Sequence, residues 1–414
     1  MTVIHNRKKR IRLILLFAAV LLALLSGTSR PAVAADGVSL RELGAESSDP
    51  EQVFGEYVDD LTDEIDFSAF EDFFNDLDGK VKEIFANQSF AELLDKTLNG
   101  EGAVDFPGLV QAFFSAFFVN LSGYLPVMIL ILAVCVLSGI FHNLRSGFAE
   151  KSTSQAVHFV TFLTVAVILV FAAVQMFELV KNTITTMKNF LNLTFPLILT
   201  MMTASGGMVS SRIFQPLAAI LLGGMTQLIV SVIFPLFLVI NVFTLLNCLT
   251  DSVKLDKLND FFKSVVHWVL GISFTVFMSF LLIQGITGGV YDGVSVRAAK
   301  YTIANSVPIV GGYLSSGFDL VVGSCVLVKN AVGVTGLVVI VGMILPPLAQ
   351  ILCFNLSLKL TAGLAQPLTD EKTSNFLSAT SKNFSLLLTV LLSASFMYFV
   401  TLTLFILSSN SVFL

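Results

Sequence analysis

Long stretches without a charged side chain alternate along this chain with short clusters of charged residues. Seven such stretches follow residue 105, at 106–144, 152–177, 189–211, 213–250, 264–291, 330–358 and 383–414. A transmembrane helix needs about 20 consecutive, mostly apolar residues. The pattern therefore predicts an all-α, polytopic helical membrane domain over residues 106–414, with seven or eight spans.

Prolines divide some of these stretches. Pro196, Gly206-Gly207, Pro216 and Pro235 interrupt residues 189–250. Because proline removes a backbone donor and clashes with the preceding turn, short or broken helices are expected there, as is a kink at Pro346-Pro347. The stretch 106–144 exceeds one span, which predicts an interfacial helix followed by a span at about 124–141.

The N-terminus has the pattern of an export signal. Five basic residues between Arg7 and Arg12 precede an apolar run from Leu13 to Leu25, and Ala32-Val33-Ala34 supplies small residues for cleavage. This predicts a cleavable signal peptide at residues 1–34. The alternative is an uncleaved anchor helix, since the run is only somewhat short for a span. In both cases the next segment faces the outside of the membrane.

That next segment, residues 35–105, is acidic and helical in period. Residues 35–120 hold 20 of the 29 Asp and Glu residues against four basic ones, a net charge of −16. Apolar residues recur at three- and four-residue steps from Phe67 to Phe85, which predicts amphipathic helices. Ser89 and Glu92 form a capping box, and Asn99-Gly100 a helix stop. A helical segment this small needs the membrane domain or a partner to pack on.

Composition agrees with a membrane protein and offers no catalytic motif. The chain is 55% hydrophobic and 13% charged, whereas soluble proteins average about 25% charged residues. No phosphate loop, HExxH or nucleophile elbow occurs, and the four histidines are scattered. We therefore expect no enzyme, no cofactor, no metal site and no nucleic-acid partner. The four cysteines lie in apolar surroundings and are expected to be packing residues.

Basic loop residues predict the orientation, because Lys and Arg concentrate in cytoplasmic loops. With the acidic segment outside, this rule places Arg145, Lys151, Lys254, Lys257, Lys263, Lys359, Lys372 and Lys382 inside. Four basic residues then lie outside as exceptions: Lys181, Lys188, Arg297 and Lys300.

Residues 285–342 are unusually rich in glycine and contain charged residues between apolar ones. They hold 11 of the 28 glycines. Glycine permits close helix contacts and unwound backbone, and irregular backbone at membrane depth must be covered by protein or water. We therefore expect this region to face inward.

Asp319 and Asn330 share one narrow helical face with Gly323 and Val326, at steps of four, seven and eleven residues. An ionisable residue in a membrane helix costs at least about 2.5–3.5 kcal/mol and is a functional candidate. Asp319 either lines a passage or substrate site, lies solvated at the outer interface, or pairs with Lys329 or Arg297. The candidate residues for a lumen or helix seam are Asp292, Arg297, Lys300, Asn305, Asp319, Lys329 and Asn330.

Several motifs in this region resemble the stage III sporulation protein AE family of endospore-forming bacteria. They are Gln284-Gly285-Ile286-Thr287, Asp292-Gly293-Val294, RAAKYT at 297–302, Asn305, VPIVGG at 307–312, Asp319 and LVKNAVG at 327–333. The export signal, the acidic segment and the polytopic remainder also fit the family's layout.

The resemblance implies a permease-like, multi-pass subunit in the mother-cell membrane around the forespore. Its acidic segment would lie in the intermembrane space. The implied partners are other membrane and ring-forming proteins of the same sporulation operon, and a forespore-encoded protein across the intermembrane space, in an oligomeric channel or secretion-like complex. The family provides no catalytic residue. Two alternatives remain, a stand-alone small-molecule permease and a purely structural membrane anchor.

Overall fold

A computed structural model describes residues 50–100, 106–148, 151–249, 255–306, 311–369 and 371–407. Every regular element in these ranges is helical. The predicted signal peptide and the first residues of the acidic segment lie outside the described ranges. Four short N-terminal helices are followed by long ones: α2 Pro50–Asp63, α3 Ser68–Asn75, α4 Gly79–Ile84, α5 Phe90–Leu98, α6 Phe106–Phe148, α7 Lys151–Ala204, α8 Met208–Leu228, a π-turn at Ile229–Ile233, α9 Phe234–Leu249, α10 Asp256–Ser306, α11 Gly311–Ala365 and α12 Glu371–Leu407.

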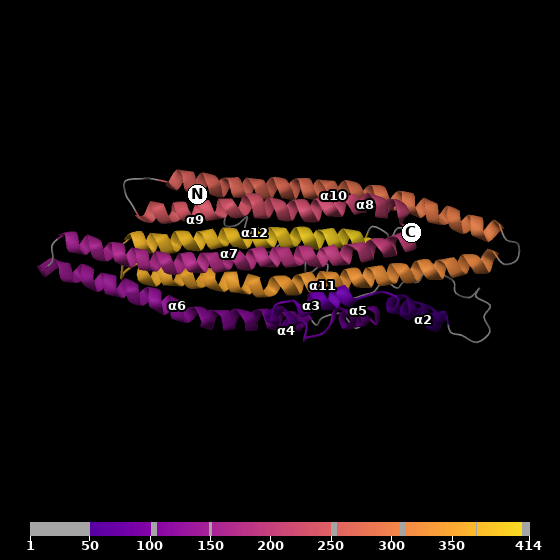
Figure 1. Ribbon diagram of the computed structural model, residues 1–414, viewed down its shortest axis with the longest axis horizontal. Coiled ribbons are helices and arrows are strands. Elements are labelled where there is room, and N and C mark those ends of the chain that lie inside the picture. The colour runs from indigo at the N-terminus through magenta and orange to yellow at the C-terminus, as the bar shows by residue number, and fades with distance from the viewer. Residues whose placement is uncertain are drawn as a thin grey trace.

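The long helices lie side by side along the longest axis of the molecule, and α2–α5 lie along its lower edge (Figure 1). The ends joining α6 to α7, α9 to α10 and α11 to α12 are all at the left of this view. The central pair is α11 and α12, because no residue is exposed from 322 to 355 or from 383 to 406. A helix that is apolar all round is expected to be covered on every side.

Six of the described helical stretches are long and apolar enough to cross a membrane, so the all-α polytopic fold is confirmed with fewer spans than expected. The predicted break at Gly206-Gly207 is confirmed, because α7 ends at Ala204 and α8 begins at Met208, but the predicted breaks at proline are wrong. Pro196 lies inside α7 and Pro216 inside α8. Pro235 follows directly after the π-turn, whose wider backbone bonding accommodates the missing donor. Residues 208–249 therefore form one rod with a local irregularity.

Helix α6 is also continuous. The predicted interfacial helix and the predicted span at 124–141 belong to the single helix Phe106–Phe148, with Pro126 inside it. The predicted start and stop of helix α5 are confirmed. Ser89 and Glu92 form the capping box, and Gly100 has a φ of 74° just after the helix end.

The exposed face of α7 changes its chemistry along the helix. From Phe159 to Val174 the exposed residues are almost all apolar, and Phe171 is 68% exposed. From Glu178 onward the exposed residues are mostly polar: Glu178, Asn182, Thr185, Asn189, Asn192, Pro196 and Thr200. A face in contact with lipid must be apolar, whereas a face in contact with water is polar. The edge of the hydrocarbon therefore lies between Val174 and Glu178.

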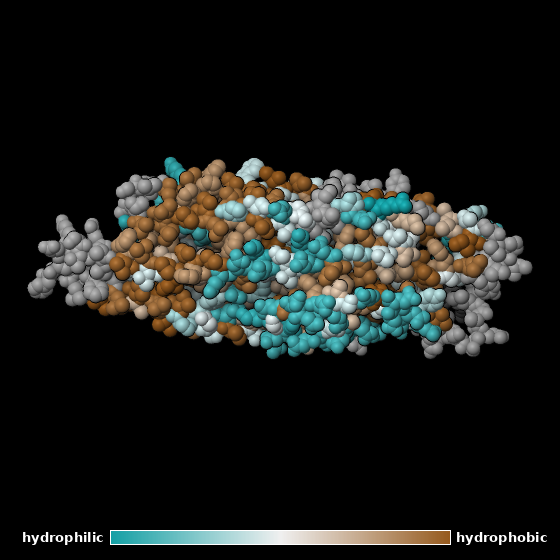
Figure 2. Space-filling model, in the orientation of Figure 1, coloured by the Kyte–Doolittle hydropathy of each residue, from teal (hydrophilic) through white to brown (hydrophobic). Residues whose placement is uncertain are grey.

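Other helices continue the same apolar surface at the same level of the bundle. We call this surface the apolar belt; Figure 2 shows it as the brown region at the left. Beyond it α7 continues from Glu178 to Ala204, about 39 Å at about 1.5 Å per residue. We call this remainder of the bundle the distal half. The exposed apolar belt residues include Leu125, Ile129 and Leu137 of α6, Leu238 and Val242 of α9, Trp268, Ile272 and Val276 of α10, and Leu356 and Leu360 of α11.

The N-terminal helices pack on the distal half through phenylalanine. Phe70 stacks on Phe90 with ring centroids 4.4 Å apart, and both rings contact Phe190 of α7. Thr97 of α5 shares a hydrogen bond of 2.9 Å with Thr335 of α11. The expectation that this segment packs on the membrane domain is thus confirmed for the described residues.

Glycines of α11 make these contacts possible. A β-carbon at Gly342 would overlap the ring of Phe85, and one at Gly333 would overlap Ile406 of α12. The expected close contacts are therefore present. The expected unwound backbone is absent from the described part of residues 285–342, where these glycines lie within regular helices α10 and α11.

Replacing Gly342 tests this packing. We expect Gly342→Ala to lower the free energy of unfolding by about 1–3 kcal/mol, because the added methyl group overlaps Phe85. The measurement is thermal unfolding of the purified chain in detergent. Gly363→Ala is the matched control, since nothing lies within 4 Å of a β-carbon there, and it should be neutral or stabilising. Equal destabilisation by both variants would contradict the account.

Candidate functional site

The structure separates the seven sequence-predicted residues into two groups. Arg297, Lys300 and Asn305 are exposed on the far end of α10. Asp319 lies opposite them on α11, half-buried. Asp292 belongs to α10, and its side chain is outside the described part of the chain.

Asp319 forms an ion pair with Lys300, joining α10 to α11. The predicted partners Lys329 and Arg297 were therefore wrong. The Lys300 side chain is 47% exposed, so water screens the pair and its contribution to stability is at most about 1 kcal/mol. Its role is to hold the two helix ends in register.

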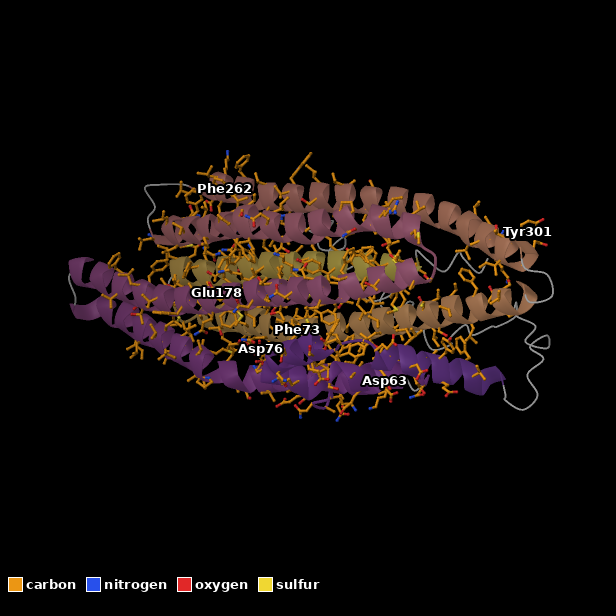
Figure 3. The ribbon with its side chains drawn as sticks, turned by 45° about the vertical axis from the view of Figure 1, so that its right-hand side comes forward. Asp63, Phe73, Asp76, Glu178, Phe262 and Tyr301 are labelled. Atoms are coloured by element: carbon orange, nitrogen blue, oxygen red, sulfur yellow. The ribbon has the colours of Figure 1, made fainter. Side chains whose placement is uncertain are left out.

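This ion pair lies near the tip of the α10–α11 hairpin, which extends beyond the ends of α7 and α12 (Figure 1). Tyr301 is 72% exposed and points away from the bundle (Figure 3). Residues 297–302, 304 and 305 are all exposed. The tip is thus an arm without cover from the described residues.

Lys329 and Asn330 lie deeper, inside the distal half. Lys329 is fully buried, and its Nζ donates a 3.0 Å hydrogen bond to the carbonyl of Ile406. Carbonyls in the last turn of a helix lack intrahelical partners and carry partial negative charge, so the ammonium group caps α12. The Oδ1 atom of Asn330 is buried without a hydrogen-bond partner among the described residues.

A second polar cluster, which the sequence analysis missed, joins three helices near the belt. Thr244 of α9 accepts hydrogen bonds of 3.0 Å from the amides of Asn259 and Asn383. Asn383 also donates to Asn241 at 3.2 Å. Single asparagines on three helices give no local pattern in the sequence, so only the packing reveals this cluster. Interhelical amide bonds of this kind hold membrane helices together.

The arrangement suits docking and assembly better than chemistry. Within the described residues no group of three or more His, Cys, Asp or Glu side chains is placed to hold a metal ion. The predicted polar residues of α11 contact neighbouring helices, and no residue from 322 to 355 is exposed. Rather than lining an open passage, α11 is a covered spine from which an arm projects.

Comparison with known proteins identifies the family. The family model for stage III sporulation protein AE matches residues 88–409. The chain belongs to the stage III sporulation protein AE family. The curated stage III sporulation protein AE of Bacillus subtilis (strain 168) is 26% identical over 320 residues, covering 76% of this chain and 78% of that protein. No solved structure matches the chain.

The match confirms the resemblance and gives a coarse function. As a member of the stage III sporulation protein AE family with six apolar helices of spanning length, the chain is a sporulation-related multi-pass membrane protein. The match includes α5 to α12 and the arm. Helices α2, α3 and α4 precede residue 88 and lie outside it.

Reversing one charge of the ion pair tests whether it holds the arm. We expect Lys300→Asp to increase amide hydrogen exchange in residues 297–321, because two carboxylates would then face each other and favour local opening. The double variant Lys300→Asp/Asp319→Lys should restore protection. Asn305→Asp, exposed and outside the pair, is the control. Unchanged exchange in Lys300→Asp would show that the pair does not hold the hairpin.

Proposed function

We propose that this chain is a membrane subunit of a channel or secretion-like complex that links the mother cell to the forespore and is required for forespore development after engulfment. The family match carries the proposal. The shape supports it, since a bundle that continues about 39 Å beyond the hydrocarbon presents a large surface to proteins outside the membrane.

The proposed orientation places the acidic helices in the space between the two membranes. Seven basic residues of the described helices belong to the part of the bundle where α6–α7, α9–α10 and α11–α12 are joined, and cytoplasmic loops are enriched in such residues. The distal half then faces the intermembrane space. The arm, formed by residues 297–305 of α10 and 312–321 of α11, is the proposed docking point for ring-forming or forespore-encoded partners.

The docking role predicts a specific sporulation defect. Deleting the gene should arrest spore development after engulfment, and the wild-type gene should restore it. Tyr301→Asp should fail to restore it while the protein accumulates to normal levels, because the exposed ring lies where a partner would bind. Thr302→Asp, at an exposed polar neighbour, is the milder control. Normal spores from the deletion strain would refute the proposal.

A stand-alone small-molecule permease is the second candidate, favoured by the asparagine cluster near the belt. The Oδ1 atoms of Asn259 and Asn383 are buried without partners among the described residues. Solute transport by the purified chain alone in liposomes would favour this candidate over a subunit that works only in a complex. A purely structural anchor would leave such liposomes inert and agrees with the covered spine.

A further inference from the structure

Two opposite sides of the distal half carry opposite charge. One is an acidic face on α2 and α3, along the lower edge in Figures 1 and 2. It holds ten exposed carboxylates and no basic residue from Glu56 to Asp78: Glu56, Asp59, Asp60, Asp63, Glu64, Asp66, Glu71, Asp72, Asp76 and Asp78.

The other side is a basic face formed by α8 and α10, along the upper edge of the molecule. Gly206, in the turn before α8, lies against Val296 of α10, so the exposed stripes of the two helices are neighbours. Arg212 and Arg297 are exposed there. In the proposed orientation both arginines lie on the outer side of the membrane, where basic residues are less common.

Each face is accompanied by exposed apolar side chains beyond the belt. Met208 is 57% and Val294 66% exposed beside the arginines. Phe114 and Phe118 of α6, the helix that packs against α4, are 54% and 62% exposed. Counting back from the α6–α7 connection, Phe114 lies further from the belt than the level of Glu178. This part of α6 then lies beyond the hydrocarbon boundary inferred on α7.

We propose that the acidic face of one copy binds the basic face of the next, so that copies of this chain assemble into a ring in the membrane. Exposed charges contribute mainly register and specificity, and burial of the apolar side chains supplies most of the free energy. If the same face of two copies met, like charges would lie opposite each other and repel.

The membrane decides the geometry of this assembly. All copies insert with the same orientation, so they differ only by translation in the membrane plane and rotation about its normal. A contact between two different faces closes into a ring where the rotation from one copy to the next divides a full turn, and without rotation it forms an open row. The ring goes beyond the proposed function, because a subunit of a complex need not bind copies of itself. It also supplies a central opening, which the covered α11 does not.

The first test measures the mass of the full chain in lipid nanodiscs or mild detergent. We expect a closed oligomer whose assembly weakens as the salt concentration rises, since salt screens the charges that set the register. Arg297→Glu should weaken assembly at least about ten-fold, because it places like charges across the contact. Asn189→Glu/Asn192→Glu makes the same change in net charge on the exposed polar stripe of α7 and should assemble as the wild type does. If Arg297→Glu unfolds at a lower temperature than the wild type, its loss of assembly could come from unfolding. Arg297→Gln then replaces it in the test.

The second test distinguishes a ring from a two-fold dimer. Chains with Asp60→Cys and chains with Arg297→Cys are mixed and treated with a bismaleimide that does not cross membranes. We expect cross-links between the two variants and none within either alone. Cys135, Cys325 and Cys353 are buried, and the half-buried Cys248 is replaced by serine in both variants so that it does not compete.

A monomeric wild-type chain, full assembly of Arg297→Glu, or cross-linking of Asp60→Cys with itself would each overturn the ring. The proposed function is tested separately, by the deletion strain, so the ring can be wrong while the proposed function is right. A monomer whose deletion still blocks spore development would remove the ring and leave the function in place.

Discussion

The thickness of the bilayer is the constraint on which the rest of this structure depends. Hydrocarbon covers about 20 helical residues, whereas α7, α10 and α11 have 54, 51 and 55 residues. At most half of each helix can face lipid. The other half must be covered by protein or present polar side chains to water, and both solutions occur. The exposed face of α7 becomes polar at Glu178, and α11 is covered on all sides from residue 322 to residue 355.

The covering of α11 explains its composition. Its glycines admit Phe85 and Ile406 where a larger residue would collide, and the N-terminal helices bring the phenylalanines that fill the space. The acidic segment is therefore an integral layer of the distal half. Its apolar side binds the spine, and its carboxylates remain in water, as expected for an amphipathic helix.

The positions of the helices could be predicted from the sequence, but the points at which they are broken or continuous at proline could not. Charge-free stretches identified the membrane helices, and the capping box at Ser89 fixed the start of α5, because both signals are local. Proline was misleading, since neighbouring helices and a π-turn accommodate Pro196 and Pro235. The candidate residues were found by type, but their partners were not. Asp319 pairs with Lys300, and the bond from Lys329 to Ile406 spans 77 residues, which no spacing rule foresees.

Membership of the sporulation family and the long distal half together point to a protein that works largely outside the lipid. The direct measurement is the reactivity of single cysteines along α7 toward a water-soluble maleimide in native membranes. Asn182→Cys and Asn189→Cys should react, and Val167→Cys and Val174→Cys should remain protected. Protection of Asn189→Cys equal to that of Val167→Cys would place the distal half in lipid and contradict the account.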